Sequence, residues 1–134
     1  MQTFNSLLGR IGLSAIFIIS GLGKLAAYAG TQQYMANAGV PGFLLPLVVL
    51  IEVGGGLFIL AGAFTRTTAV VLALFTLAAG FLFHANLADQ NQFIHFFKNI
   101  AIAGGFLTLA ANGPGPISID ALRRKRSLGA PVTA

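Results

Sequence analysis

Residues 42–66, GFLLPLVVLIEVGGGLFILAGAFTR, decide the fold, because they combine a long apolar run with a single carboxylate. At ~1.5 Å rise per residue, a helix over this stretch crosses a hydrocarbon core about 30 Å thick. Glu52 lies near its middle, where a charge costs at least ~2.5 kcal/mol on insertion scales. We therefore expect Glu52 to face a bundle interior, where it is paired, protonated or reached by a ligand. The glycines at 54–56 allow a neighbouring helix to approach closely.

The composition of the whole chain is that of an integral membrane protein. Of its 134 residues, 56% are hydrophobic and 8% are charged, whereas a soluble domain carries about a quarter charged residues. The net charge of +5 could suggest nucleic-acid binding, but four of the eight Lys and Arg residues lie at 123–126 and indicate membrane topology instead. The absence of cysteine excludes disulfides, thiolate metal sites and thiol–disulfide chemistry. The expected partner is a lipid bilayer and not a nucleic acid.

Three further apolar runs predict three more membrane helices. The first, residues 4–28, lacks the basic N-terminal region and the cleavage pattern of a signal peptide and is too long for its apolar region, so we expect it to be retained. The polar connection at 29–41 should leave the bilayer. A short turn at Thr65 and Arg66 requires an antiparallel hairpin, and the GPGP sequence at 113–116 ends the last helix. The sequence therefore predicts an all-α, integral membrane four-helix bundle as a single domain (1–134), with spans at about 4–28, 43–64, 67–84 and 93–111 and a basic cytoplasmic tail at 117–134.

Four spans place both termini on one side of the membrane, and the basic residues indicate which side. Arg66 and the four basic tail residues lie on the side of the termini, whereas Lys24 lies on the other side. By the positive-inside rule, the side with more Lys and Arg is cytoplasmic. The sequence thus predicts a multi-pass protein with N-in and C-in orientation, whose connections at 24–41 and 84–92 face outward.

The intramembrane charges need partners, and their depths limit the choice. Arg10 is separated from Glu52 by roughly 9 Å along the membrane normal, and Lys98 lies at a similar distance on the other side. Either cation, or both, could hold the carboxylate. We predict a structural Arg10–Glu52 ion pair, and such a pair can orient helices without taking part in chemistry. Lys24 and Arg66 lie close enough to the ends of spans to act as interface anchors.

A polar cluster is expected in the outer half of the bundle. His95, Lys98 and Asn99 share one helical face, because they are three and four residues apart. His84 lies across a short loop from them. Together with Glu52 they would line a functional cavity, and the alternative is a polar plug that only fixes helix register. The two histidines have no spacing typical of metal or haem ligands, so no metal site is predicted.

These residues also carry a resemblance to a known family. The chain resembles the DoxX family of small bacterial membrane proteins, in particular its inner-membrane YqjF-like branch, over nearly its whole length. The combination of motifs is far more specific than any single one. The matching stretches are GRIGLSAIFIISGLGKL (9–25), AGTQQYMANAGVPGFLLPLVVLIEVGGGLFILAGAFTRTTA (29–69), FLFHANLAD (81–89), FFKNIAIAGGFLTLA (96–110) and GPGPISID (113–120).

The resemblance implies a four-helix bundle in the bacterial inner membrane and a role in redox processes. Some DoxX proteins are similar to subunits of thiosulfate:quinone oxidoreductases, others are linked with oxidoreductase partners, and many have no assigned activity. The chain carries no haem, flavin or cysteine motif, so electrons would come from a substrate or a partner. The positions that match the family motifs are Arg10, Lys24, Glu52, Thr65, Arg66, His84, Lys98 and Asn99.

Two functions remain as alternatives. In the first, the chain is the membrane-embedded subunit of an oxidoreductase system, which binds quinone or a similar small amphipathic ligand and acts with a partner subunit. Glu52, His84 and Lys98 are its predicted catalytic residues, because quinone reduction requires protons. In the second, the chain is a non-catalytic scaffold or a transport module for a small solute or anion. A homo-oligomer is compatible with either function, and the residues assigned to ligand binding are Arg10, Lys24, His95 and Asn99.

Overall fold

The computed structural model describes residues 1–129, and this part of the chain is helical without strands. Four of its helical stretches are long and apolar enough to cross a membrane, which confirms the predicted all-α membrane four-helix bundle. Residues 130–134 of the predicted tail lie outside the described part. The four stretches are Gln2–Ala26, Gly42–Ala61, Thr65–Phe83 and Gln90–Asn112.

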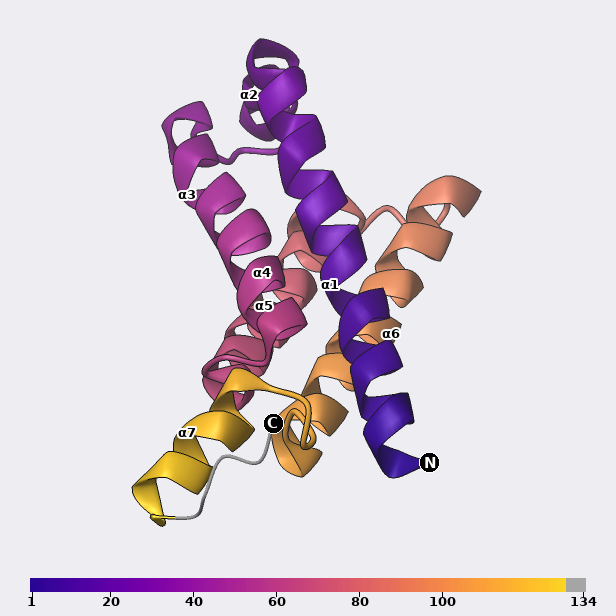
Figure 1. The fold of residues 1–134 in the computed structure, drawn as a ribbon. Helices are drawn as coiled ribbons and strands as arrows, with labels where there is room; N and C mark the ends of the chain where they lie inside the picture. Colours follow the sequence, from indigo (N-terminus) through magenta and orange to yellow (C-terminus); the bar gives the residue numbers. More distant parts are fainter. Residues whose placement is uncertain (130–134) are drawn as a thin grey trace.

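The second span changes helix type along its length, and two shorter helices lie outside the four spans (Figure 1). A π-helical segment carries Glu52 in the middle of the second span. The connection at 29–41, expected as a simple loop, contains a helix whose Met35 is buried against the bundle. In chain order the elements are α1 (Gln2–Ala26), α2 (Tyr28–Asn37), the 3₁₀ turn η1 (Gly42–Leu44), α3 (Leu45–Val49), the π-helix η2 (Leu50–Gly54), α4 (Gly55–Ala61), α5 (Thr65–Phe83), α6 (Gln90–Asn112) and α7 (Ile119–Ser127).

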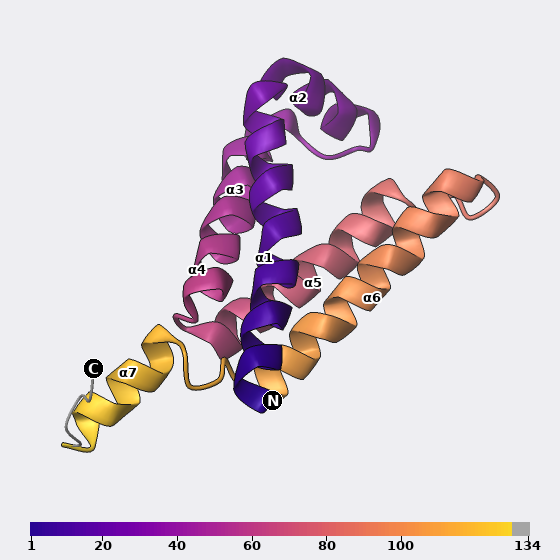
Figure 2. The same cartoon turned by 45° about the vertical axis from the view of Figure 1, so that its right-hand side comes forward.

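The spans form two closely packed pairs. Helix α1 runs along η2 and α4, and α5 forms an antiparallel hairpin with α6. In Figure 2 this hairpin leans away from α1 toward the end of the bundle at which α2 lies. The N-terminus and α7 lie at the opposite end. The bundle is therefore narrow near the termini and wider near α2.

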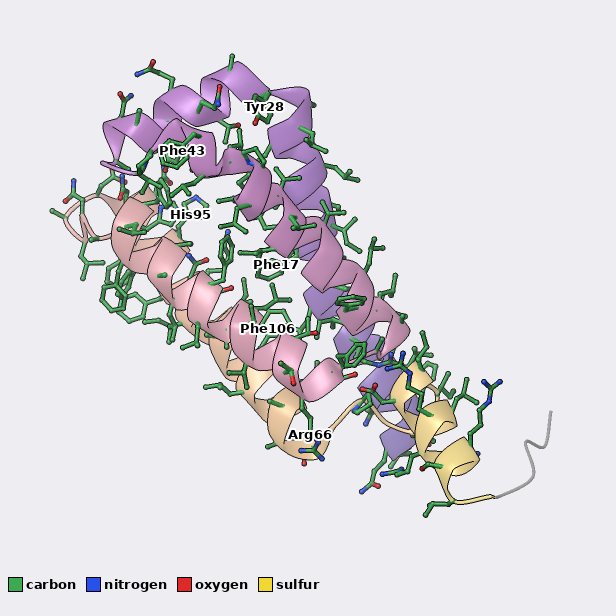
Figure 3. All side chains as sticks on the ribbon, turned by 90° about the vertical axis from the view of Figure 1, so that its left-hand side faces the viewer. Phe17, Tyr28, Phe43, Arg66, His95 and Phe106 are labelled. Carbon is green, nitrogen blue, oxygen red and sulfur yellow. The ribbon has the colours of Figure 1, made fainter. Side chains whose placement is uncertain are left out.

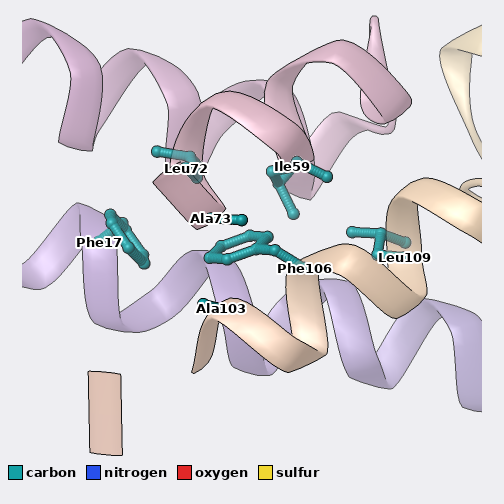
Figure 4. Close-up of a cluster of buried hydrophobic side chains, with 8 residues drawn as sticks. Phe17, Ile59, Leu72, Ala73, Ala103, Phe106 and Leu109 are labelled. Carbon is teal, nitrogen blue, oxygen red and sulfur yellow. The ribbon is translucent and has the colours of Figure 1, made fainter. Parts of the chain in front are cut away.

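The core fills the narrow half of the bundle. Phe106 is fully buried there and meets the ring of Phe17 edge to face, with 5.3 Å between ring centroids. Figure 4 shows these two rings from α6 and α1 together with aliphatic side chains from α4, α5 and α6. The buried cluster comprises Phe17, Ile59, Ala69, Leu72, Ala73, Ala103, Phe106 and Leu109.

Small residues allow α1 to lie directly against the second span. A Cβ atom added at Gly21 would lie 2.6 Å from Val53 Cγ2 and 3.2 Å from Glu52 Cβ. Such a contact is too short for any side chain, so glycine is what permits this approach. The backbone of α1 thus passes directly beside Glu52, as expected for small residues at the interfaces of membrane helices.

Helix α7 is attached to the bundle through Asp120. Its carboxylate accepts hydrogen bonds from Phe64 N at 2.8 Å and Thr65 N at 2.9 Å, and thereby caps the first turn of α5. Burial by itself would raise the pKa of Asp120, but the hydrogen bonds from Thr65 and Phe64 and the charge of Arg123 outweigh it and lower the pKa below its usual value. The carboxyl is therefore ionised at neutral pH and can accept both bonds.

Candidate functional site

The wide half of the bundle encloses a cavity of about 460 Å³. Its volume lies in the range of small-molecule sites, and apolar side chains make up most of its wall. Figure 3 shows Phe17 and His95 in the space between the helices, with Arg66 at the far end of the bundle. The polar side chains that line the cavity are Ser20, Lys24, Thr31, Tyr34, Glu52, Thr76, His84, His95, Lys98 and Asn99.

Glu52 forms an ion pair with Lys24 on one wall of this cavity. The Lys24 amine lies 3.0 Å from Oε1 and 2.9 Å from Oε2, and it also donates a hydrogen bond to Ser20 Oγ at 2.7 Å. The Glu52 side chain is 7% exposed and that of Lys24 is 27% exposed, so the carboxylate lies deeper than the amine. Lys24, at the last turn of α1, thus joins α1 to the π-helical segment of the second span.

The predicted Arg10–Glu52 pair is wrong, and so is the alternative pair with Lys98. Arg10 is 1% exposed, and its guanidinium donates to the carbonyl oxygens of Ile59, Leu60 and Ile117 near the termini. The reason is that helical side chains lean toward the N-terminus of their own helix. In α1 the Arg10 side chain therefore points away from Glu52, and the Lys24 amine points toward Ser20, one turn closer to the N-terminus. In the antiparallel second span, Glu52 leans toward Lys24.

A second group of polar side chains lies on the wall formed by α5 and α6. The rings of His84 and His95 stack with 5.0 Å between centroids, across the loop that joins the two helices. The Lys98 amine lies 3.0 Å from His95 Nδ1. Asn99 packs beside Gly80 and also lines the cavity. Hence all predicted site residues except Arg10 surround one space, although they come from three of the four spans and the connection after α5.

Several residues that line the cavity were not predicted from the sequence. Thr31, Tyr34 and Met35 come from α2, which covers the wide end of the cavity. The ring of Tyr34 stacks on Phe83 at the end of α5, with 5.3 Å between centroids. Thr76 lies in the middle of α5, and its buried hydroxyl has no hydrogen-bond partner within the described residues. Thr76 is a polar residue within an apolar span, and this pattern could have indicated that its helix face lines a cavity.

Glu52 lies in a π-helical segment, and the geometry of this segment determines the position of its side chain. A π-helix widens the turn and leaves the regular i to i−4 hydrogen-bond pattern, and such segments occur frequently at functional sites. Here it spans Leu50–Gly54 and therefore includes the carboxylate and the first glycine of the triplet. No group of three or more potential metal ligands lies close together within residues 1–129. The polar and ionisable side chains that line the cavity can form hydrogen bonds and exchange protons with a small ligand.

Comparison with known proteins places the chain in a family. The family model described as DoxX matches residues 6–85, more than half of the chain. The chain belongs to the DoxX family. This agrees with the resemblance seen in the sequence. The matched region runs from α1 through α5 and contains Lys24, Glu52 and His84, whereas the residues from α6 follow it.

Three relatives extend this DoxX assignment. Inner membrane protein YqjF of Escherichia coli (strain K12) is 56% identical over 126 residues, which cover 94% of this chain and 97% of YqjF. Inner membrane protein YphA of the same organism is 40% identical over 121 residues, or 85% of this chain and 86% of YphA. The protein named "Putative oxidoreductase CatD" of Bacillus subtilis (strain 168) is 34% identical over 74 residues, or 55% of each chain. No solved structure gives a significant match.

Proposed function

We propose that this DoxX protein is the membrane-embedded subunit of an oxidoreductase system and binds a quinone, or a similar small amphipathic ligand, in the cavity. The observation that carries the proposal is the cavity itself, which is enclosed mainly by apolar side chains and has polar groups on two facing walls. A quinone matches this arrangement, because its ring is apolar and its two carbonyl oxygens accept hydrogen bonds. The relative named as an oxidoreductase supports the redox assignment.

Some residues of the cavity would bind the ligand, and others would transfer protons to it. The Lys98 amine lies 3.0 Å from His95 Nδ1, and its remaining N–H groups can donate a hydrogen bond to one carbonyl oxygen of the ligand. The Thr76 hydroxyl, which has no hydrogen-bond partner within residues 1–129, supplies a further donor on the same wall. Reduction of a quinone to a quinol takes two electrons and two protons. We assign one proton to His84 and the other to the Lys24–Glu52 pair, in which the Lys24 ammonium carries the proton and Glu52 accepts it and passes it to the ligand. The electrons come from a partner oxidoreductase subunit.

We also propose an N-in and C-in orientation of the chain. Two relatives are named inner membrane proteins, and the basic residues of α7 lie at the end of the bundle that holds the N-terminus. By the positive-inside rule this end is cytoplasmic, which gives an N-in and C-in protein in the inner membrane. The cavity then opens in the outer half of the bilayer, where a membrane-soluble ligand enters between the helices.

Replacing Lys98 by methionine is expected to weaken quinone binding about tenfold, because one charge-assisted hydrogen bond is lost. The matched control is Lys125→Met, which removes the same charge from α7, far from the cavity. The measurement is the affinity for a short-chain benzoquinone in detergent, together with the quinone that co-purifies with each variant.

Two results would count against this proposal. Unchanged quinone affinity with reduced stability in Lys98→Met would make the cavity residues a polar plug that fixes helix register. Stabilisation by a small anion, dependent on Lys98 and without any quinone binding, would instead favour a scaffold or transport module.

A further inference from the structure

A second pocket of about 460 Å³ lies at the end of the bundle that holds the N-terminus, and it is separate from the cavity described above. The first turn of α5, the last residue of α6, the GPGP segment and α7 enclose it. Arg66, Thr67 and Arg124 contribute two guanidinium groups and a hydroxyl group to its wall. The carboxylate of Asp120 also lines the pocket, but it already accepts hydrogen bonds from two backbone N–H groups. This composition fits an anion with several oxygen atoms, such as a phosphate group.

The pocket lies at the level where lipid phosphate groups occur. Helix α5 begins at Thr65 and α6 ends at Asn112, so two membrane spans end at its wall. The segment that follows α6 turns outward into α7, which lies outside the four-span bundle (Figure 2). A pocket at the shared end of two spans opens into the headgroup region of the bilayer.

Within residues 1–129 the positive charges around the pocket are not paired in salt bridges, although the charge of Arg123 acts on Asp120. Among the described residues the only salt bridge is Lys24–Glu52, so the four exposed cations at 123–126 have no carboxylate partner. The nearest carboxylate, Asp120, is occupied by the backbone N–H groups of Phe64 and Thr65. Arg66 donates from Nη1 to the carbonyl oxygens of Ala110 and Ala111, which leaves its other nitrogen atoms without an acceptor in the described part.

Apolar side chains accompany these charges, as in a helix that lies in a membrane interface. Phe64, Ile119 and Leu122 are exposed on the same end of the molecule. The guanidinium of Arg123 lies over the Phe64 ring at 4.5 Å from its centroid. Apolar side chains that enter the acyl boundary next to cations at the headgroups are typical of interfacial helices.

We propose that this pocket, together with α7, binds the phosphate group of an anionic phospholipid of the surrounding leaflet. Arg124 and the unengaged nitrogen atoms of Arg66 hold the phosphate oxygens, while the acyl chains lie beside Phe64 and the exposed apolar residues of α7. The hydrogen bonds of Asp120 fix the position of α7 and thus the distance between the two arginines. The site serves attachment to a leaflet and is independent of quinone binding.

The test compares Arg124→Gln with Arg126→Gln in the full chain. Both variants remove one positive charge from α7, but only Arg124 lines the pocket. In an uncharged detergent, the shift of the melting midpoint is measured against short-chain phosphatidylglycerol, against phosphatidylcholine with the same acyl chains, and against inorganic phosphate. Phosphatidylglycerol is expected to stabilise the wild type most. Arg124→Gln should weaken its apparent affinity about fivefold, and Arg126→Gln less than twofold.

Three outcomes would overturn the proposal. Equal losses in the two variants would show diffuse attraction to α7 rather than a site in the pocket. Equal stabilisation by inorganic phosphate would identify a site for a free anion, and equal stabilisation by phosphatidylcholine would show that the lipid charge is not recognised.

Discussion

Lys24→Met is expected to destabilise the protein by about 3 to 5 kcal/mol, because it leaves the Glu52 carboxylate buried without its cation. Glu52 has no other hydrogen-bond donor in the described part of the chain, and its side chain is 7% exposed. The free energy of unfolding can be measured by titration with SDS from mixed micelles. Glu52→Gln should cost less than Lys24→Met, because an amide oxygen still accepts a hydrogen bond from Lys24.

The double variant Lys24→Met with Glu52→Leu distinguishes a pair from two independent residues. Replacement of both members of a buried ion pair by apolar residues is often close to neutral. We therefore expect the double variant to be more stable than Lys24→Met alone. Additive losses would contradict the pair. If the double variant folds, it also allows ligand binding to be measured in a cavity that lacks both charges.

Arg10→Met is expected to cost at least about 2 kcal/mol, because it leaves the backbone carbonyl groups of Leu60 and Ile117 near the termini without a donor. Arg10 donates to three carbonyl groups. The Leu60 carbonyl belongs to the last turn of α4 and has no other donor in the described structure, whereas the Ile59 carbonyl keeps a hydrogen bond from Gly62 N at 3.1 Å. The third, in Ile117, lies directly before α7. Arg10→Lys should restore only part of the loss, since one ammonium group cannot reach all three carbonyls with the geometry of a guanidinium.

Arg126→Gln is the control for Arg10→Met, because Arg126 is exposed on α7 and forms no hydrogen bond through its side chain in the described structure. Both variants remove one arginine charge, so a general effect of charge on stability would affect them equally. Equal unfolding free energies for the two variants would show that the Arg10 contacts do not hold α4 and α7 together.

The long helices could be predicted because each requires only an apolar run of sufficient length. The π-helix at Leu50–Gly54 in the second span could not be predicted, because an apolar run alone does not distinguish one type of helix from another. Helix α2 was missed because its residues are polar on average. Met35 is the one residue of α2 that is fully buried, and Tyr34 stacks on Phe83.

The depth of the candidate site residues in the membrane could be predicted from the sequence, but the ion-pair partner of Glu52 could not. Distance along the membrane normal placed Glu52 and Lys98 in the same half of the bundle, and the short loop after α5 brought His84 next to His95. The same reasoning assigned Arg10 to Glu52, because it used Cα positions and neglected the lean of side chains toward the helix N-terminus. Over two antiparallel helices this lean moves Arg10 and Glu52 apart and brings Lys24 and Glu52 together.

The most direct test of ligand binding in the cavity is photolabelling with an azido derivative of a short-chain benzoquinone, followed by mapping of the labelled peptides. We predict labelling of the cavity wall formed by α2, α5 and α6, including Tyr34 and Met35, and loss of this labelling with excess unmodified quinone. Labelling that is confined to α7 or to the lipid-facing surface, or that excess quinone does not reduce, would contradict a quinone site between Lys24–Glu52 and Lys98.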